Sequence, residues 1–103
     1  MQAHPDVSDV NSHFGGMDIT GSNIVFMTAI EDPWQGSQMV SIHDPVIQKE
    51  MVAHHIDCTD CSHCVDLHSP SASDPPALTN ARQMAEDQIT KWLQEEKEMQ
   101  FLQ

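Results

Sequence analysis

The sequence has few of the large apolar residues that build a protein interior. Leucine, isoleucine, valine and phenylalanine together make up 21 of its 103 residues. This share is close to the level of about one fifth below which strongly charged chains tend to stay unfolded. The length suits one domain and leaves no room for a second independent core. We therefore expect one small module whose fold depends on more than its apolar core.

Basic residues are also scarce. Four lysines and arginines stand against 16 aspartates and glutamates, for a formal net charge of −12. This charge disfavours direct binding to nucleic acids and to anionic membranes. The sequence contains no apolar run near the roughly 20 residues of a membrane span, and its first residues lack the basic and apolar regions of a signal peptide. We therefore predict a soluble chain of cytoplasmic or, for the reasons below, virion location, without nucleic-acid or membrane partners.

Motifs that would identify an enzyme are missing as well. The sequence has no Gly-x-Ser-x-Gly, no phosphate-binding glycine-rich loop and no His-Glu-x-x-His. Nucleophilic hydrolysis, nucleotide chemistry and catalytic zinc therefore have no positive support. We predict that the chain is not an enzyme, has no catalytic residues and takes no small-molecule substrate.

The first half of the chain predicts an arm followed by a β-hairpin. Residues 1–22 combine glycine and proline with polar residues and show no apolar period, which is typical of an extended arm. Residues 23–30 are rich in β-branched and aromatic side chains and predict a strand, and residues 38–42 are a second candidate. The intervening Asp32-Pro33-Trp34-Gln35-Gly36 has turn chemistry. A hairpin with a long loop follows from this order.

A short helix is expected next, over residues 45–55. Asp44 is suited to cap its start, and Pro45 to occupy its first position. A spacing of four, three and four residues places two apolar side chains and two potential metal ligands on one face. These residues are Ile47, Met51, His54 and Cys58.

The C-terminal part predicts one long helix. Residues 69–76 are a connector rich in serine and proline, and residues 77–103 are mostly good helix formers with an apolar stripe. The predicted fold is therefore α+β: a small zinc-stabilised domain with an extended N-terminal arm (1–22), a hairpin and zinc module (23–68), a connector (69–76) and a C-terminal helix (77–103).

Three cysteines within seven residues suggest a metal site. Cys58, Cys61 and Cys64 are odd in number and too close together for the framework of a secreted disulfide protein. Two thiolates in Cys-x-x-Cys can bind one ion from a tight turn, and a histidine four residues earlier can join them. His54, Cys58 and Cys61 are therefore the first three predicted ligands of a structural Zn²⁺, with His55 as an alternative to His54.

The fourth ligand is left open by the sequence. Cys64 is chemically the strongest candidate, followed by His68 and His63. The run Cys58-x2-Cys61-x2-Cys64-x3-His68 also has the spacing of a bacterial ferredoxin run, with histidine in the last place. An iron–sulfur cluster and a set of free thiols therefore remain alternatives to zinc.

The stretch from His54 to Cys61 resembles the His-x3-Cys-x2-Cys signature of zinc-binding anti-sigma domains. The wider layout, a small acidic chain with a His/Cys cluster and a terminal helix, also resembles short zinc proteins of actinobacteria and their tailed phages. The first resemblance implies a transcription regulator that binds a protein partner. The second implies no particular activity.

An extended arm, a metal-stapled core and a terminal helix fit an accessory subunit of a large assembly. Our leading hypothesis is a non-enzymatic zinc-binding structural subunit, such as a minor capsid or connector-type protein of a phage virion, with other protein subunits as its partners. The alternatives are an anti-sigma-like regulator and an iron–sulfur electron carrier.

Overall fold

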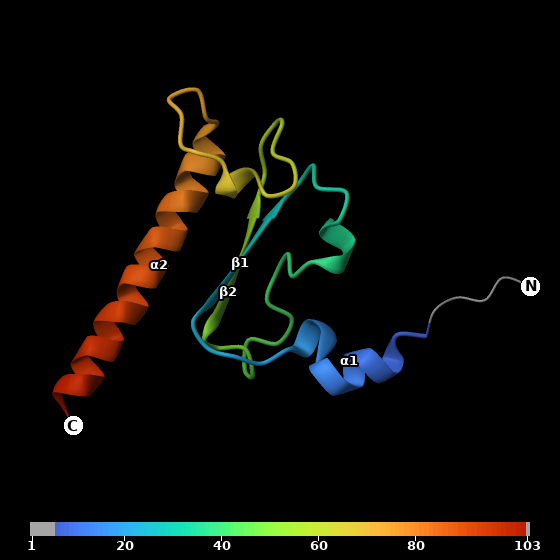
Figure 1. The fold of residues 1–103 in the computed structure, drawn as a ribbon, viewed down its shortest axis with the longest axis vertical. Coiled ribbons are helices and arrows are strands. Elements are labelled where there is room, and N and C mark those ends of the chain that lie inside the picture. Colours follow the sequence, from blue (N-terminus) through green and yellow to red (C-terminus); the bar gives the residue numbers. More distant parts are fainter. Residues whose placement is uncertain (1–5, 103) are drawn as a thin grey trace, which may run out of the picture.

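The computed structural model of the protein describes residues 6–102. Its elements in chain order are α1 (Ser8–Phe14), η1 (Gly16–Asp18), β1 (Ile24–Ala29), η2 (Gln35–Ser37), β2 (Met51–Ile56), η3 (Val65–Leu67) and α2 (Pro76–Phe101). Helix α2 lies along one side of the two strands, and α1 lies near the ends where the strands begin, away from α2 (Figure 1). Within residues 6–102, none of the helices has the length and apolarity needed to cross a membrane.

The two strands are parallel, so the predicted hairpin is wrong. Ile24 pairs with Met51 and the register continues to Ala29 opposite Ile56. Parallel strands need a crossover of a dozen or more residues, and residues 30–50 supply it. Residues 38–42, the predicted second strand, are irregular. The two strands therefore end at the same edge, and the loops that follow them are neighbours.

The predicted helix over residues 45–55 is also wrong, because its second half forms β2. Gln48 explains the change. Its side chain is almost fully buried, with 1% exposure, and its Oε1 accepts the backbone N–H groups of His43 and Asp44 at 3.0 and 2.9 Å. Its Nε2 donates to the carbonyls of Met17 and Ile19, at 2.8 Å each. These contacts fix a turn where local sequence favours a helix.

The core lies at the end of the sheet where the strands finish. It joins the last residues of both strands to the loop after β2 and to the first turns of α2. Its buried members are Ala29, Ile56, Cys61, Leu78 and Ala81. The apolar interior therefore supports the loops that follow β1 and β2.

Helix α2 covers nearly the residues of the predicted C-terminal helix. Pro75 is its N-cap and Pro76 its first residue. Proline suits the first position of a helix, because the backbone N–H that it lacks would have no partner within the helix there. The predicted arm is not uniformly extended. Residues 1–5 lie outside the described residues, but α1 forms a short helix that ends at Phe14 and is capped by Gly15, whose φ of 98° favours glycine.

Candidate active-site pair

Asp32 lies in the tight turn that follows β1. Its backbone N–H donates to the carbonyl of Ala29 at 3.1 Å, and its carbonyl accepts the N–H of Gln35 at 3.2 Å. The residue is only 2% exposed. A carboxylate this deeply buried requires hydrogen-bond partners, because an unpaired buried charge is strongly unfavourable.

Three donors meet this carboxylate. The backbone N–H of Trp34 donates to Oδ1 at 2.8 Å, and the side-chain Nε2 of Gln38 donates to Oδ2 at 3.0 Å. The third partner is His63, whose Nδ1 lies 2.6 Å from the same Oδ2. The carboxylate of Asp32 is thus held on both oxygens.

His63 comes from the loop that follows β2, 31 residues further along the chain. Its side chain is 52% exposed, whereas that of Asp32 is 3% exposed. A buried carboxylate therefore holds one nitrogen of a solvent-accessible imidazole. This arrangement fixes the ring and leaves Nε2 to exchange protons.

The surroundings of Asp32 favour its charged form. Burial by itself raises the pKa of this carboxyl, but the hydrogen bonds from His63, from the Trp34 N–H and from Gln38 together outweigh it. The net result is a pKa of Asp32 below its ordinary value of 3.8. Asp32 is therefore a carboxylate at neutral pH.

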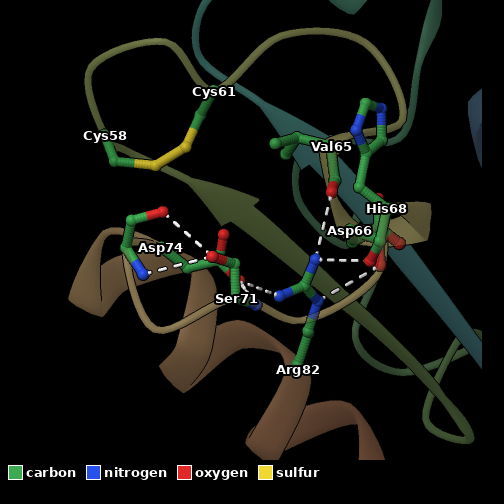
Figure 2. A network of polar contacts seen from close by, with 9 residues as sticks. Cys58, Cys61, Val65, Asp66, His68, Ser71, Asp74 and Arg82 are labelled. Carbon is green, nitrogen blue, oxygen red and sulfur yellow. Dashed lines mark hydrogen bonds and ion pairs between the residues drawn. A yellow bond between two sulfur atoms is a disulfide. The ribbon is translucent and has the colours of Figure 1, made fainter.

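A disulfide between Cys58 and Cys61 shapes the loop that carries His63 (Figure 2). Their Cα atoms are 5.4 Å apart, and the N–H of Cys61 donates to the carbonyl of Cys58 at 3.3 Å. Cys61 is 1% exposed and belongs to the core. The disulfide therefore closes a tight turn that is anchored in the interior two residues before His63.

Arg82 of α2 holds the other end of the same loop (Figure 2). Its Nη1 pairs with Asp74 Oδ2 at 2.6 Å. Its remaining donors reach the carbonyls of Val65, Asp66 and His68, at 3.4, 3.3 and 2.7 Å. The guanidinium thus fixes η3, which begins two residues after His63.

A cavity of about 250 Å³ opens beside the Asp32–His63 pair. Both residues line it, together with Met27, Gln38, Cys64 and Leu67 among others. None of the described residues that line the cavity is a serine. The cavity combines an acid, an imidazole and apolar surface.

The predicted zinc ligands do not form a metal site. Cys58 and Cys61 are bonded to each other, Cys64 is a free exposed thiol, His54 lies in β2 opposite Met27, and His68 follows η3. Within residues 6–102, no group of three or more His, Cys, Asp and Glu side chains is arranged to hold an ion. The zinc prediction is therefore wrong, and the physical reason is that two of the three thiols are joined in a disulfide.

The known proteins that this chain resembles are all serine peptidases. The family model described as serine carboxypeptidase S28 matches residues 1–85. A probable serine protease EDA2 of Arabidopsis thaliana is 29% identical in an alignment 105 residues long. The alignment covers 89% of this chain and 20% of the relative. Thymus-specific serine proteases of Mus musculus and Homo sapiens are 27% and 29% identical, over 91% and 92% of this chain and 17% of each relative. The chain thus spans about one fifth of these relatives, and no solved structure gives a significant match.

These matches overturn the functional predictions. The resemblance to zinc-binding anti-sigma domains and to zinc proteins of phages is wrong, since the matched family is one of serine peptidases. For the same reason the non-enzymatic virion subunit, the anti-sigma-like regulator and the iron–sulfur carrier are wrong, and the expectation that the chain is not enzymatic fails with them.

The predicted virion or cytoplasmic location is also wrong. The matched relatives are serine proteases of a plant and two mammals, not virion proteins. The Cys58–Cys61 disulfide is at odds with a cytoplasm that keeps thiols reduced.

Sequence reasoning missed the Asp32–His63 pair. The sequence places Asp32 in a turn and makes His63, like His68, a candidate behind Cys64 for the fourth zinc ligand. The useful signal is the order of the elements: an acidic residue in the loop after one β-rich run and a histidine in the loop after the next. That signal requires recognising β2 as a strand.

Proposed function

Because the chain belongs to the serine carboxypeptidase S28 family, we propose that Asp32 and His63 are the acid and the base of a Ser-His-Asp triad that hydrolyses peptide bonds. The observation that carries this proposal is the 2.6 Å contact between His63 Nδ1 and Asp32 Oδ2. Its support is the burial of the carboxylate and the exposure of the imidazole.

The two residues have separate roles in this reaction. Asp32 accepts the Nδ1–H of His63, which sets the tautomer in which Nε2 carries a lone pair. Nε2 takes the proton of the serine hydroxyl as its oxygen attacks the peptide carbonyl, and then gives that proton to the leaving amine. Water hydrolyses the resulting acyl-enzyme by the same proton transfers. Asp32 stays ionised throughout and stabilises the imidazolium that forms in each step.

The order of the two residues along the chain supports the same role. In α/β-hydrolase triads the acid precedes the histidine in sequence, as Asp32 precedes His63. In open sheets with parallel strands, sites lie outside the carboxyl ends of the strands. Asp32 and His63 follow the carboxyl ends of β1 and β2.

The nucleophile is proposed to come from outside residues 6–102. No serine among residues 6–102 lines the cavity beside His63, although the attacking oxygen must lie within hydrogen-bond reach of the imidazole. The relatives are about five times as long as the part that this chain matches. We therefore assign this chain the acid and base of the site and leave the serine and the oxyanion donors to the rest of the enzyme.

The test is peptide hydrolysis by the full polypeptide that carries the nucleophilic serine. Asp32→Asn is expected to lower kcat by about 10⁴-fold, because the amide favours the wrong imidazole tautomer. His63→Ala should cause a loss of at least similar size. The control is His68→Ala, because His68 lies in the same loop but contacts Arg82 through its backbone carbonyl. Retained kcat in the first two variants would refute the proposal.

We also propose that the substrates are peptides with a free C-terminal carboxylate, as the family description implies. Matched peptides with free and amidated C-termini separate this point from the first. Faster hydrolysis of the free acid supports it, whereas equal rates contradict the substrate class and leave the Asp32–His63 assignment intact.

A further inference from the structure

Gln38 reaches back from the end of η2 to the carboxylate of Asp32. Its Nε2 donates to Oδ2 at 3.0 Å, and this is the same oxygen that faces His63 Nδ1 at 2.6 Å. The Trp34 N–H already restrains Oδ1. Without Gln38, the oxygen that orients His63 would keep the imidazole as its single donor among these three contacts.

The orientation of the Gln38 amide follows from charge. A carboxylate accepts hydrogen bonds and repels another acceptor, so the NH₂ end must face Asp32. This choice leaves Gln38 Oε1 buried without a hydrogen-bond partner among the described residues. A buried acceptor left unpaired is unfavourable, which indicates that the contact with Asp32 dominates the placement of this side chain.

A second glutamine in the same turn provides a comparison. Gln35 lies three residues earlier, and its Nε2 donates to the backbone carbonyl of Ile30 at 2.9 Å in an exposed position. Gln35 therefore holds the loop without touching the carboxylate. The two glutamines share chemistry and location but differ in their acceptor.

We propose that Gln38 is a positioning residue of the active site, whose amide holds Asp32 Oδ2 in the place where it orients His63. This inference rests on the proposed role of the Asp32–His63 pair. Gln38 acts through Asp32 and contacts no reacting atom. The carboxylate and the imidazole take part in proton transfer, and the side chain of Gln38 fixes the geometry between them.

Other titratable groups near Asp32 can also influence its pKa. His63, Cys64 and Asp66 line the same cavity, and Glu31 precedes Asp32 in the turn. Of these groups, His63 has a side-chain hydrogen bond to the carboxylate. A variant at Gln38 leaves all four in place.

The experiment follows the ionisation of Asp32 in this chain by ¹³C NMR of its carboxyl carbon. Gln38→Met removes the donor at similar side-chain length and is expected to raise the pKa of Asp32 by about one unit, the order of one hydrogen bond to a charged group. Gln38→Glu should raise it further, because two carboxylates then share one site. Gln35→Met is the matched control and should leave the pKa of Asp32 unchanged.

Two outcomes separate the inference from the proposed function. An unchanged pKa of Asp32 in both Gln38→Met and Gln38→Glu overturns the role of Gln38. A pKa of Asp32 that does not rise in His63→Asn instead counts against the pairing of Asp32 with His63. Gln38→Glu also keeps the test valid if Gln38→Met fails to fold.

In the full enzyme, Gln38→Met should lower kcat by about tenfold with KM unchanged, since a loosened carboxylate affects proton transfer more than substrate binding. A change in KM alone would contradict a positioning role.

Discussion

The backbone N–H of Glu31 donates to the carbonyl of Cys61 at 3.1 Å. This hydrogen bond joins the turn that carries Asp32 to the loop that carries His63. Ile30 adds a second link, because its N–H donates to the carbonyl of Ile56 at 2.9 Å. The hydrogen bonding between the two strands thus continues one residue past the end of β1, from Ile30 to Ile56, the last residue of β2. Asp32 and His63 meet because their loops are fastened together by the backbone.

The disulfide should contribute to stability. Replacing both Cys58 and Cys61 with alanine is expected to lower the free energy of unfolding by about 2 kcal/mol. This is the stabilisation expected when a disulfide closes a loop of a few residues and so reduces the conformational entropy of the unfolded chain. Urea unfolding measures the change. Cys64→Ala is the control, because Cys64 is exposed and unbonded, and it should stay within about 0.5 kcal/mol of the parent. Equal stability of the double variant and the parent would contradict this view.

The state of the thiols can be read directly. Denatured without a reductant and in the presence of a chelator, the protein should expose one reactive thiol, that of Cys64. After reduction it should expose three, because Cys58 and Cys61 are released. Three reactive thiols before reduction would instead indicate unbonded or metal-bound cysteines.

Gln48 should be among the most sensitive polar positions. Gln48→Leu removes four hydrogen bonds at a side chain with 1% exposure. It leaves two backbone N–H groups without their partner, and the expected loss is about 2–4 kcal/mol in the free energy of unfolding. Gln83→Leu is the control, because the exposed side chain of Gln83 donates to the carboxylate of Asp87 one turn along α2. A loss for Gln48→Leu no larger than that of the control would contradict the proposed bridging role.

Arg82 should matter through geometry as well as charge. Arg82→Lys keeps the positive charge but cannot reach Asp74 and three carbonyls at once. We expect both Arg82→Ala and Arg82→Lys to lower the melting temperature, the alanine variant more strongly. Lys91→Ala on α2 should leave it nearly unchanged. Full stability of Arg82→Lys would show that charge alone is sufficient.

Stability should fall in acid through specific aspartates. The Ser71 N–H and Arg82 hold the pKa of Asp74 below its ordinary value of 3.8, and Asp32 is shifted in the same direction. A carboxyl with a lowered pKa in the folded state stabilises the protein above its unfolded-state pKa, and this stabilisation is lost as the pH falls through the folded-state value. Stability should therefore decline as the pH falls below about 4.

Asp74→Asn tests this assignment. The variant should be less stable at neutral pH and should lose less stability between neutral pH and strong acid than the parent does. Urea midpoints measured from neutral pH to about pH 2 follow both effects. An identical acid-induced loss in variant and parent would exclude Asp74 as a source of the decline.

Local features explain which elements the sequence could predict. Pro75 and Pro76 precede a long run of good helix formers, so α2 follows from residues that are close together in the chain. The β-branched run of β1 is a local signal of the same kind. The sequence predicts a helix for the segment that forms β2. The contacts of Gln48 that set its actual course reach Met17 and Ile19, about 30 residues away, so they leave no local signal.

The cysteine cluster shows a different limit. The spacing Cys58-x-x-Cys61 is compatible with a shared metal ion and with a disulfide, since both place two sulfur atoms at one turn. Spacing gives distance along the chain but not the oxidation state of the thiols. The closeness of Cys58 and Cys61 was therefore predictable, and the bond between them was not.

By itself, the sequence determined the long terminal helix, the first strand and the acidic net charge. Only the tertiary structure decided that Asp32 and His63 form a pair. Each lies in a loop, and the residues next to it in the chain do not direct it toward the other. In an antiparallel hairpin the loops that follow the two strands would lie at opposite ends of the sheet. Parallel pairing of β1 with β2 brings two carboxyl ends to one edge, and hydrogen bonds across that edge fix the acid against the imidazole.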